Sequence, residues 1–301
     1  MKNPLDPDNP LGEVFGFPIL NEDAQALRYR EQKLCPFNNK VPNCTKDKAK
    51  DPLGVCSVNT SKQPVITCPV RFREDWLIVT EAAKFFFPDG AKYTSLTEIR
   101  LLDVNRQSAG NIDVVLVSYD ERGRLTDFGS LEIQGVYISG NLRSAFEAYN
   151  QRPTPAFKWR GSAQYYPSPD YLSSSRKRLI PQMLYKGGIF HHWGKKQSVA
   201  LQTSFFETLP AMPEVPAERA EIAWFLYDLV FDEITKRFKL THTRTVYTEF
   251  TAALQTVTNP RPGKVEDFIT LLQGRLDATL EGTSSNPPDA PTLGDILTNE
   301  P

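Results

Sequence analysis

The sequence predicts an α/β fold in which helices flank a mixed β-sheet. Runs of β-branched and aliphatic residues follow one another in the middle of the chain, and segments with helical periodicity lie before and after them. This order is typical of a sheet covered by helices. The stretch Leu34–Arg73 differs, because it contains all four cysteines and little that could build a conventional core. We expect an arm and cysteine module at 1–73, a main domain at 74–280 and a flexible tail at 281–301.

The composition is that of an ordinary globular protein. The 301 residues have a net charge of −1, with 40% hydrophobic and 24% charged residues. We find no apolar run of 18 or more residues and no basic-then-apolar N-terminus, which argues against a membrane span and a secretory signal. We therefore expect a cytoplasmic protein with no membrane partner. Near-neutral charge does not exclude a nucleic-acid partner, because basic residues cluster locally.

Hydrophobic spacing and breaker residues predict the elements in order. Helices are expected at Asn21–Lys33, Asp75–Pro88, Leu142–Tyr149, Ser173–Phe190, Ala217–Arg237 and Val265–Leu280. Strands are expected in a hairpin at Asn111–Tyr137, at Lys195–Phe206 and at Leu240–Tyr247, while Leu96–Arg106 fits a strand or a short helix. Ala217–Arg237 shows the clearest helical spacing, with acidic residues near its start and basic residues near its end. Pro181 should start, stop or kink its helix.

The hairpin over Asn111–Tyr137 contains the candidate chemistry. Asp113 opens its first strand, and Glu132 and Gln134 lie two residues apart on the second, so their side chains share a face. If the strands pair, Asp113 comes near Glu132. Lone buried carboxylates are costly, so this pair beside an apolar sheet indicates a divalent cation. The alternative is the polar edge of an ordinary hairpin.

The four cysteines suggest a local staple in the N-terminal module. They are separated by eight, eleven and eleven residues, at Cys35, Cys44, Cys56 and Cys68. In a cytosolic chain, such a group favours a tetrahedral metal site with four thiolate ligands over two disulfides. Disulfides and unrelated free thiols stay open as alternatives, because the CxxC pairs of common zinc ribbons are absent.

The layout D-x₁₈-E-x-Q over Asp113, Glu132 and Gln134 resembles the PD-(D/E)XK nuclease pattern. In that pattern, two acids on adjacent strands hold Mg²⁺, and a lysine follows the second acid by two residues. Here Gln134 takes the lysine position, and Ile112 precedes the aspartate. The pattern alone is weak, since D…ExQ occurs by chance in many chains.

The cysteine block between Leu34 and Phe72 makes the resemblance specific. It is similar to the N-terminal metal module of the NotI family of type II restriction endonucleases, whose catalytic strand is also E-x-Q. Glu98, fifteen residues before Asp113, stands where that family has a glutamate. The block SRKRLIPQMLYKGGI, followed by HHWGKK, also resembles the family. The match covers roughly residues 30–210.

The resemblance implies a PD-(D/E)XK nuclease core and a type II site-specific deoxyribonuclease. It implies catalytic roles for Glu98, Asp113, Glu132 and Gln134, and Mg²⁺ bound by Asp113, Glu132 and the carbonyl of Ile133. The cysteine module would hold iron, with zinc as the alternative. It further implies a bacterial homodimer that cuts double-stranded DNA at a GC-rich palindrome, for which CGGCCG, read by EagI-like members, is our best single candidate.

Two other functions stay open at this point. One is a noncatalytic DNA-binding protein stapled by its cysteine metal site, and the other is a structure-selective repair nuclease with the same core. Cleavage of plasmid DNA into discrete fragments would distinguish a site-specific deoxyribonuclease from both alternatives.

Two groups of residues are candidate DNA contacts. Arg176, Lys177 and Arg178 follow three serines at a helix start, and such clusters grip phosphates and read guanine. Gln182 and Lys186 lie one and two turns further on. The second group follows the last cysteine and consists of Arg71 and Arg73. The plain alternative for the helix is a solvated surface.

Overall fold

The structure, a computed structural model, describes residues 8–38, 41–47, 50–159, 161, 165–259 and 262–281. The chain forms two compact units, Met1–Thr258 and Asn259–Pro301. The second unit contains helix α9 (Val265–Leu280), which has the bounds predicted from the sequence. The predicted tail lies outside the described residues, apart from Glu281. The predicted boundaries after residues 73 and 280 stay predictions.

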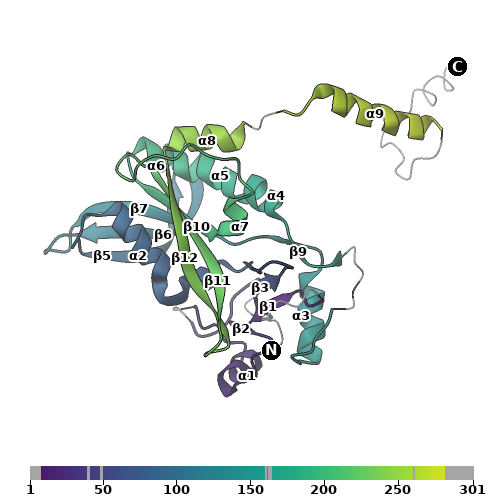
Figure 1. Cartoon of the computed structure of the whole chain (residues 1–301). Helices are drawn as coiled ribbons and strands as arrows, with labels where there is room; N and C mark the ends of the chain where they lie inside the picture. Colours follow the sequence, from purple (N-terminus) through teal and green to yellow (C-terminus); the bar gives the residue numbers. More distant parts are fainter. Residues whose placement is uncertain are drawn as a thin grey trace. The chain divides into compact units, whose positions relative to one another are not determined.

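A six-stranded mixed sheet forms the centre of the first unit (Figure 1). The strand order is β12-β11-β10-β7-β6-β5. Strands β5, β6 and β7 form an antiparallel meander. Strand β10 is parallel to both of its neighbours, β7 and β11, and β12 pairs antiparallel with β11 at the edge of the sheet. The strands are β5 (Tyr93–Leu102), β6 (Ser108–Tyr119), β7 (Leu125–Gln134), β10 (Gln197–Gln202), β11 (Ile222–Asp232) and β12 (Arg237–Thr248). The predicted mixed sheet is confirmed.

The predicted hairpin is formed by β6 and β7. The Asp120 carboxylate accepts the backbone N–H groups of Arg122 and Arg124 at 2.9 and 2.8 Å, and Gly123 takes a left-handed φ of +74°. These contacts satisfy the turn's own backbone groups, as expected for an Asp-led turn ending in glycine. The hairpin is therefore set by local chemistry that the sequence displays.

The helix predicted at Ala217–Arg237 is wrong, because this segment forms β11 and the first residue of β12. Strand β11 lies between β10 and β12, and both of its faces are covered. Its core-facing side chains include Trp224 on one face and Phe225 on the other. A strand buried on both faces reads as a continuous apolar run, and helical spacing can be found in such a run by chance.

Helices and an N-terminal sheet cover the two faces of the central sheet. On one face, α2 (Leu77–Phe86) packs over Leu116, Ile133 and Phe225. The other face, with Val199 and Leu201, belongs to a core cluster that also contains Phe146, Met183 and Phe250 from helical segments and Val58 from the N-terminal sheet. The other helical segments are α1 (Ala24–Glu31), a 3₁₀ segment (Pro69–Trp76), α3 (Leu142–Gln151), α7 (Thr203–Phe206) and α8 (Phe250–Thr258); β8 (Ile138–Ser139) and β9 (Ser168–Pro169) form a small ladder.

One long helical path crosses the second face between Tyr171 and His192. It consists of α4 (Tyr171–Ser174), a π-helical segment (Ser175–Leu179), α5 (Ile180–Gln182), a second π-helical segment (Met183–Gly187) and α6 (Gly188–His192). Pro181 neither ends nor starts this path. Its ring and missing N–H disturb the regular i→i−4 ladder, and the wide turns on either side accommodate that disturbance.

The N-terminal residues form a buried sheet, which the sequence analysis did not predict. Its order is β2-β1-β3-β4, with β1 (Leu11–Val14), β2 (Phe17–Pro18), β3 (Val55–Asn59) and β4 (Pro64–Ile66). All residues of these strands are buried. The expectation of a stretch with little core is therefore wrong. The strands are too short, and their partners too distant in sequence, for periodicity to reveal them.

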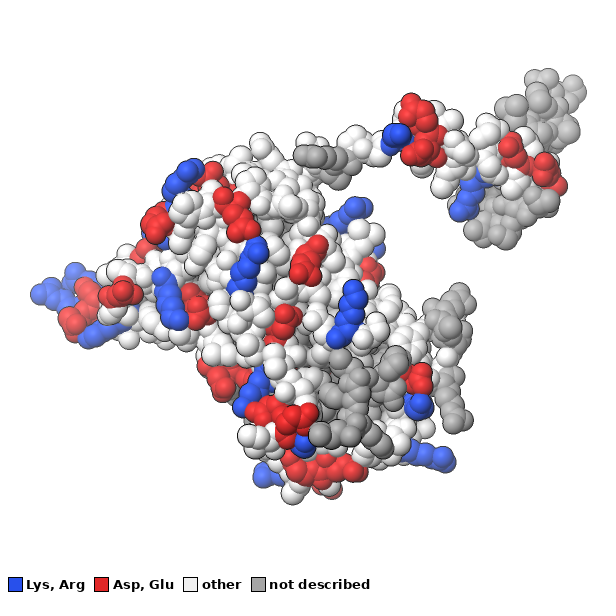
Figure 2. Space-filling model, viewed as in Figure 1, with Lys and Arg blue, Asp and Glu red and all other residues white. Residues whose placement is uncertain are grey.

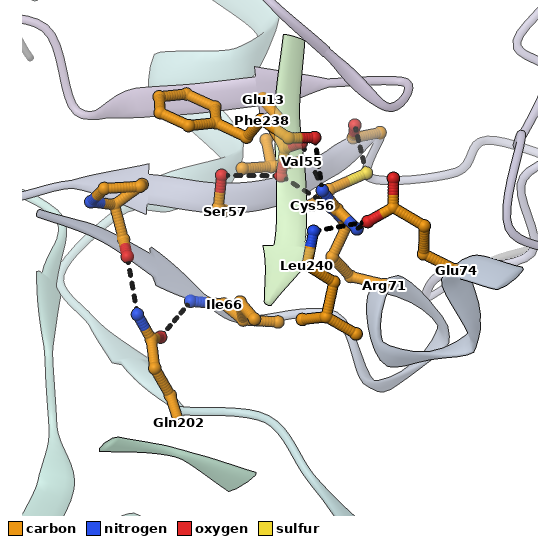
Figure 3. A network of polar contacts seen from close by, with 12 residues as sticks. Glu13, Val55, Cys56, Ser57, Ile66, Arg71, Glu74, Gln202, Phe238 and Leu240 are labelled. Atoms are coloured by element: carbon orange, nitrogen blue, oxygen red, sulfur yellow. Dashed lines mark hydrogen bonds and ion pairs between the residues drawn. The ribbon is translucent and has the colours of Figure 1, made fainter. Parts of the chain in front are cut away.

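A buried ion cluster joins this sheet to the central one and overturns the DNA-contact prediction for Arg71 (Figure 3). Arg71 Nε lies 3.0 Å from both carboxylate oxygens of Glu13, and its other nitrogens donate to Glu74 at 2.7 Å and to the carbonyl of Phe238 at 2.9 Å. The Arg71 and Glu13 side chains are 0% exposed. A guanidinium enclosed in this way cannot reach DNA. Burial raises the pKa of Glu13, which Arg71 partly offsets.

Candidate active site

The candidate site lies where strands β6 and β7 separate. The last pair between them is Val114 with Leu131, whereas β7 stays paired with β10 as far as Gln134. Just past that last pair, Asp113 Oδ2 accepts the backbone N–H of Ile133 at 2.8 Å. The Asp113 carboxylate thus accepts an N–H that would otherwise bond to a backbone carbonyl of the neighbouring strand. This hydrogen bond places Asp113 beside Glu132, as predicted.

Glu132 is held in a largely buried position on the face opposite α2. Its side chain is 14% exposed, and Oε2 accepts a 2.7 Å contact from the ammonium of Lys186. Among the described residues, Oε1 is buried with no hydrogen-bond partner. Burial and the adjacent Asp113 raise the pKa of Glu132 to about 7, although Lys186 opposes the shift. An unpartnered carboxylate oxygen beside a second carboxylate fits a divalent cation.

Lys186 lies inside the protein, which contradicts its predicted role as a DNA contact. It is 7% exposed, and its Nζ donates to Glu132 and, at 2.8 Å, to the backbone carbonyl of Asn111. The sequence contained a signal for this position. Leu179, Met183 and Phe190 form the buried stripe of the helical path, and Lys186 falls on that stripe at helical spacing. A lysine on an apolar stripe requires a partner inside the fold.

Gln134 shares the face of Glu132 and is 8% exposed. Its amide nitrogen donates to the carbonyl of Gly135 at 2.8 Å. The side chain is therefore fixed at the end of β7 and provides no charge. Its predicted role in orienting water stays a prediction.

Glu98 lies on β5 at the position that faces Asp113. The flanking pairs are Thr97 with Val114 and Ile99 with Ile112, and no ladder pair forms between them. Glu98 is exposed and has a left-handed φ of +58°. Such a conformation is strained for a residue with a Cβ and is often found at functional positions. The register thus places Glu98 opposite Asp113, while the catalytic role of Glu98 stays a prediction.

A small cavity lies between the helical path and the sheet. Its volume is about 20 Å³, and its lining includes Glu132, Gln182 and Lys186. A cavity of this size with polar groups on its wall has room for one water molecule. The site thus combines two carboxylates and an ammonium, with a small cavity beside Glu132 and Lys186.

Three predicted DNA contacts lie exposed on the first π-helical segment. They are Arg176, Lys177 and Arg178, and the guanidinium of Arg178 lies 4.8 Å from the centre of the Tyr137 ring. Gln182 is half-buried on the same path. Arg73 is also half-buried and lies 5.9 Å from the Trp76 ring. These residues stay candidate contacts. In the face shown in Figure 2, acidic and basic side chains are interspersed rather than separated.

The four cysteines are free thiols that lie within electrostatic reach of one another. Backbone hydrogen bonds link Cys35 to Pro42 and Cys44 to Lys33, while the β3–β4 hairpin links Cys68 to Cys56. Burial raises the pKa of Cys35 to about 11, and negative charge on the other thiols adds to this rise. In their deprotonated form, clustered cysteine thiols are the ligands that a soft cation prefers.

Within the residues that the structure describes, no group of three or more His, Cys, Asp or Glu side chains is arranged tightly enough to hold a metal ion. Among the described residues, neither the cysteines nor the carboxylates of the candidate site form such a group. Metal binding at either place therefore rests on the chemistry of the donor groups.

His191 has an acidic partner that its sequence neighbourhood did not reveal. Its Nδ1 lies 2.7 Å from Glu221, whose other oxygen accepts the N–H of Phe250 at 2.8 Å. The imidazole also stacks on the Phe250 ring at 4.6 Å. These contacts join α6 to β11 and α8. They give His191 a structural role.

Comparison with known proteins gives one family. The family model described as restriction endonuclease NotI matches residues 14–240, which is more than half of the chain. The matched range contains the four cysteines, Asp113, Glu132 and the helical path. The comparison with curated proteins gives no match. No helix among the described residues is both long and apolar enough to cross a membrane. A fold with a nuclease-like mixed sheet and a family match of this extent lead to one conclusion: the chain belongs to the NotI family of restriction endonucleases and is a type II site-specific deoxyribonuclease.

Proposed function

We propose that the chain hydrolyses double-stranded DNA with Mg²⁺ bound by Asp113, Glu132 and the backbone carbonyl of Ile133. The observation that carries this proposal is the convergence of the two carboxylates where β6 and β7 separate, with Glu132 Oε1 unpartnered among the described residues. The N–H of Ile133 points to Asp113. In a strand, the N–H and C=O of one residue point to the same side, which supports the carbonyl as a third ligand.

The residues of the site divide the work of phosphodiester hydrolysis. When bound, Mg²⁺ supplies charge neutralisation for the phosphate and lowers the pKa of the attacking water. Asp113 is held by the Ile133 N–H and so keeps its orientation. Gln134 orients the water through its amide group. The surrounding apolar sheet limits access of bulk water, which strengthens each electrostatic contact.

The test is cleavage of a GC-rich plasmid by the purified full-length chain. Discrete fragments that require Mg²⁺, disappear with EDTA and disappear in Glu132→Ala support the proposal. Glu218→Ala is the matched control, because Glu218 is exposed on the loop before β11. Absence of cleavage over a range of divalent cations and salt concentrations, by a chain shown to be folded, would sink it.

We further propose a homodimer acting on a GC-rich palindrome, with CGGCCG as the first sequence to examine. A palindrome has twofold symmetry, and two identical active sites related by the same symmetry would cut both strands. Exposed Arg176, Lys177 and Arg178, together with Gln182 and Arg73, are the proposed DNA contacts. Light scattering on the free chain should give twice the monomer mass. A monomeric mass, both free and on DNA, would contradict the dimer.

We propose that the cysteine cluster binds one iron or zinc ion per chain. The support is the mutual electrostatic influence of the four buried or half-buried thiols. Metal analysis of the purified protein distinguishes the two ions, since iron bound by thiolates is coloured and zinc is not. Four thiols that all react in folded, metal-free protein would contradict the proposal.

A further inference from the structure

The two carboxylates of the candidate site would balance the charge of a bound Mg²⁺, so further positive charge is needed to offset that of the phosphate. A phosphodiester is an anion, and charge is redistributed over its oxygens as the water attacks. Asp113 and Glu132 bring two carboxylates to the same point, and Gln134 brings none of the positive charge that a lysine in its place would supply. A fixed cation near Glu132 would offset this imbalance.

We propose that Lys186 is the positioning residue that supplies this charge: it holds the Glu132 carboxylate and offsets the negative charge of the site during DNA cleavage. The inference rests on the proposed nuclease site. The ammonium lies 2.7 Å from Glu132 Oε2 and 2.8 Å from the Asn111 carbonyl, so it is fixed to both β7 and β6. The ammonium of Lys186, on the helical path, thus supplies the positive charge that a lysine at position 134 of the strand would otherwise supply.

The surroundings of Lys186 indicate that this position is built into the fold. Its alkyl stem passes Gly110, where an added Cβ would lie 3.6 Å from Lys186 Cδ. Gly110 has a φ of +110°, which residues with a Cβ rarely adopt. Lys186 also lies within the second π-helical segment, a wide turn that is rare and often occurs at functional sites.

A purely structural explanation of this lysine is less satisfactory. The side chain is 9% exposed, and burying an ammonium is unfavourable unless its partners compensate. Its flanking positions on the stripe, Met183 and Phe190, are apolar, so the ammonium is held at this point by Glu132 and the Asn111 carbonyl and not by a polar surface of the helix. Retention of a charge at this point is therefore more easily explained by the chemistry beside it.

The same helical path carries the exposed basic residues proposed to contact DNA. Arg178 and Lys186 are separated by about two turns of this path, one on the surface and one at the carboxylates. The helical path that carries basic side chains on the surface therefore also carries the ammonium beside Glu132.

Four variants test the inference in the full-length protein. Lys186→Gln keeps a donor for the Asn111 carbonyl but removes the charge, whereas Lys186→Arg keeps the charge. The double variant Gln134→Lys/Lys186→Gln restores a lysine on the strand. Lys62→Gln, an exposed lysine in the β3–β4 turn, is the matched control. Each variant is assayed for melting temperature, for DNA affinity in EDTA and for single-turnover cleavage at saturating enzyme with Mg²⁺.

We expect Lys186→Gln to lower the single-turnover rate at least about 100-fold, the scale of losing one preorganised electrostatic group, while DNA affinity changes less than about twofold. Lys186→Arg should retain most of the rate, and the double variant should recover at least about tenfold. A Lys186→Gln rate within about threefold of wild type, a loss explained by DNA affinity, or an inactive double variant would overturn the inference.

Two controls keep the outcome unambiguous. If Lys186→Gln does not fold at the assay temperature, Lys186→Arg decides the matter, because a folded Lys186→Arg protein without cleavage removes charge as the explanation. If wild type itself does not cleave DNA, the proposed function fails. If wild type cleaves and Lys186→Gln cleaves equally well, only the role of Lys186 fails.

Discussion

The charge on Glu132 should destabilise the metal-free protein, and Glu132→Gln should relieve this cost. Burial and Asp113 raise the pKa of Glu132 to about 7 from its ordinary 4.5. The folded state therefore binds a proton more tightly than the unfolded state. Between these two values stability falls as pH rises, and above pH 7 the ionised carboxylate costs about 3 kcal/mol. The neutral glutamine does not carry this cost.

Thermal unfolding at two pH values measures the effect. In EDTA at pH 8, Glu132→Gln should melt about 6 °C above wild type, since about 1 kcal/mol corresponds to about 2 °C in a unit of this size. At pH 4.5 the two proteins should melt together. The control is Glu218→Gln, which changes an exposed residue and should leave both temperatures unchanged. A Glu132→Gln protein that melts below wild type at pH 8 would refute the reasoning, because the carboxylate would then stabilise the fold.

Three further predictions follow from other contacts. Arg71→Met leaves the buried Glu13 carboxylate without its partner, so unfolding should become easier by about 3–5 kcal/mol, and a melting temperature within 2 °C of wild type would contradict this. At limiting Mg²⁺, single-turnover cleavage should fall as pH drops below about 7, because protonated Glu132 cannot bind the metal; a flat profile down to pH 5.5 would argue against Glu132 as a ligand. Lys177→Ala should weaken DNA binding and reduce the salt slope by about one, as titrations at several salt concentrations would show; an unchanged slope would exclude a phosphate contact.

Local sequence signals predicted those parts of the fold that local contacts stabilise. The β6–β7 turn is held by Asp120, and α3 begins where the Asn141 side chain accepts the N–H of Ser144 at 3.0 Å. Both devices lie within a few residues of the groups that they satisfy. The E-x-Q strand was also visible, because alternation along a strand places Glu132 and Gln134 on one face in any fold that keeps the strand.

The parts that failed depend on partners far away in the sequence. Strand β11 was taken for a helix because segments distant in sequence determine its environment: β10 and β12 pair with its two edges, and other layers of the fold bury its two faces. Arg71 was taken for a surface residue because its partner Glu13 lies 58 residues away. The spacing of residues within either segment does not reveal these distant partners. Pairing between distant segments decides burial, and burial decides whether a charged residue binds DNA or stabilises the core.

The position of Lys186 follows from topology rather than from spacing. Strands β7 and β10 are parallel neighbours, so the chain must cross one face of the sheet between them. The helical path over Tyr171–His192 lies in that crossover, on the face to which Glu132 and Gln134 point. Lys186, on the inner stripe of this path, reaches Glu132 on the E-x-Q strand. A lysine there can supply charge to the carboxylates from a different element, which leaves position 134 free to hold a neutral amide. The absence of a lysine two residues after Glu132 therefore does not by itself mean that the site lacks one.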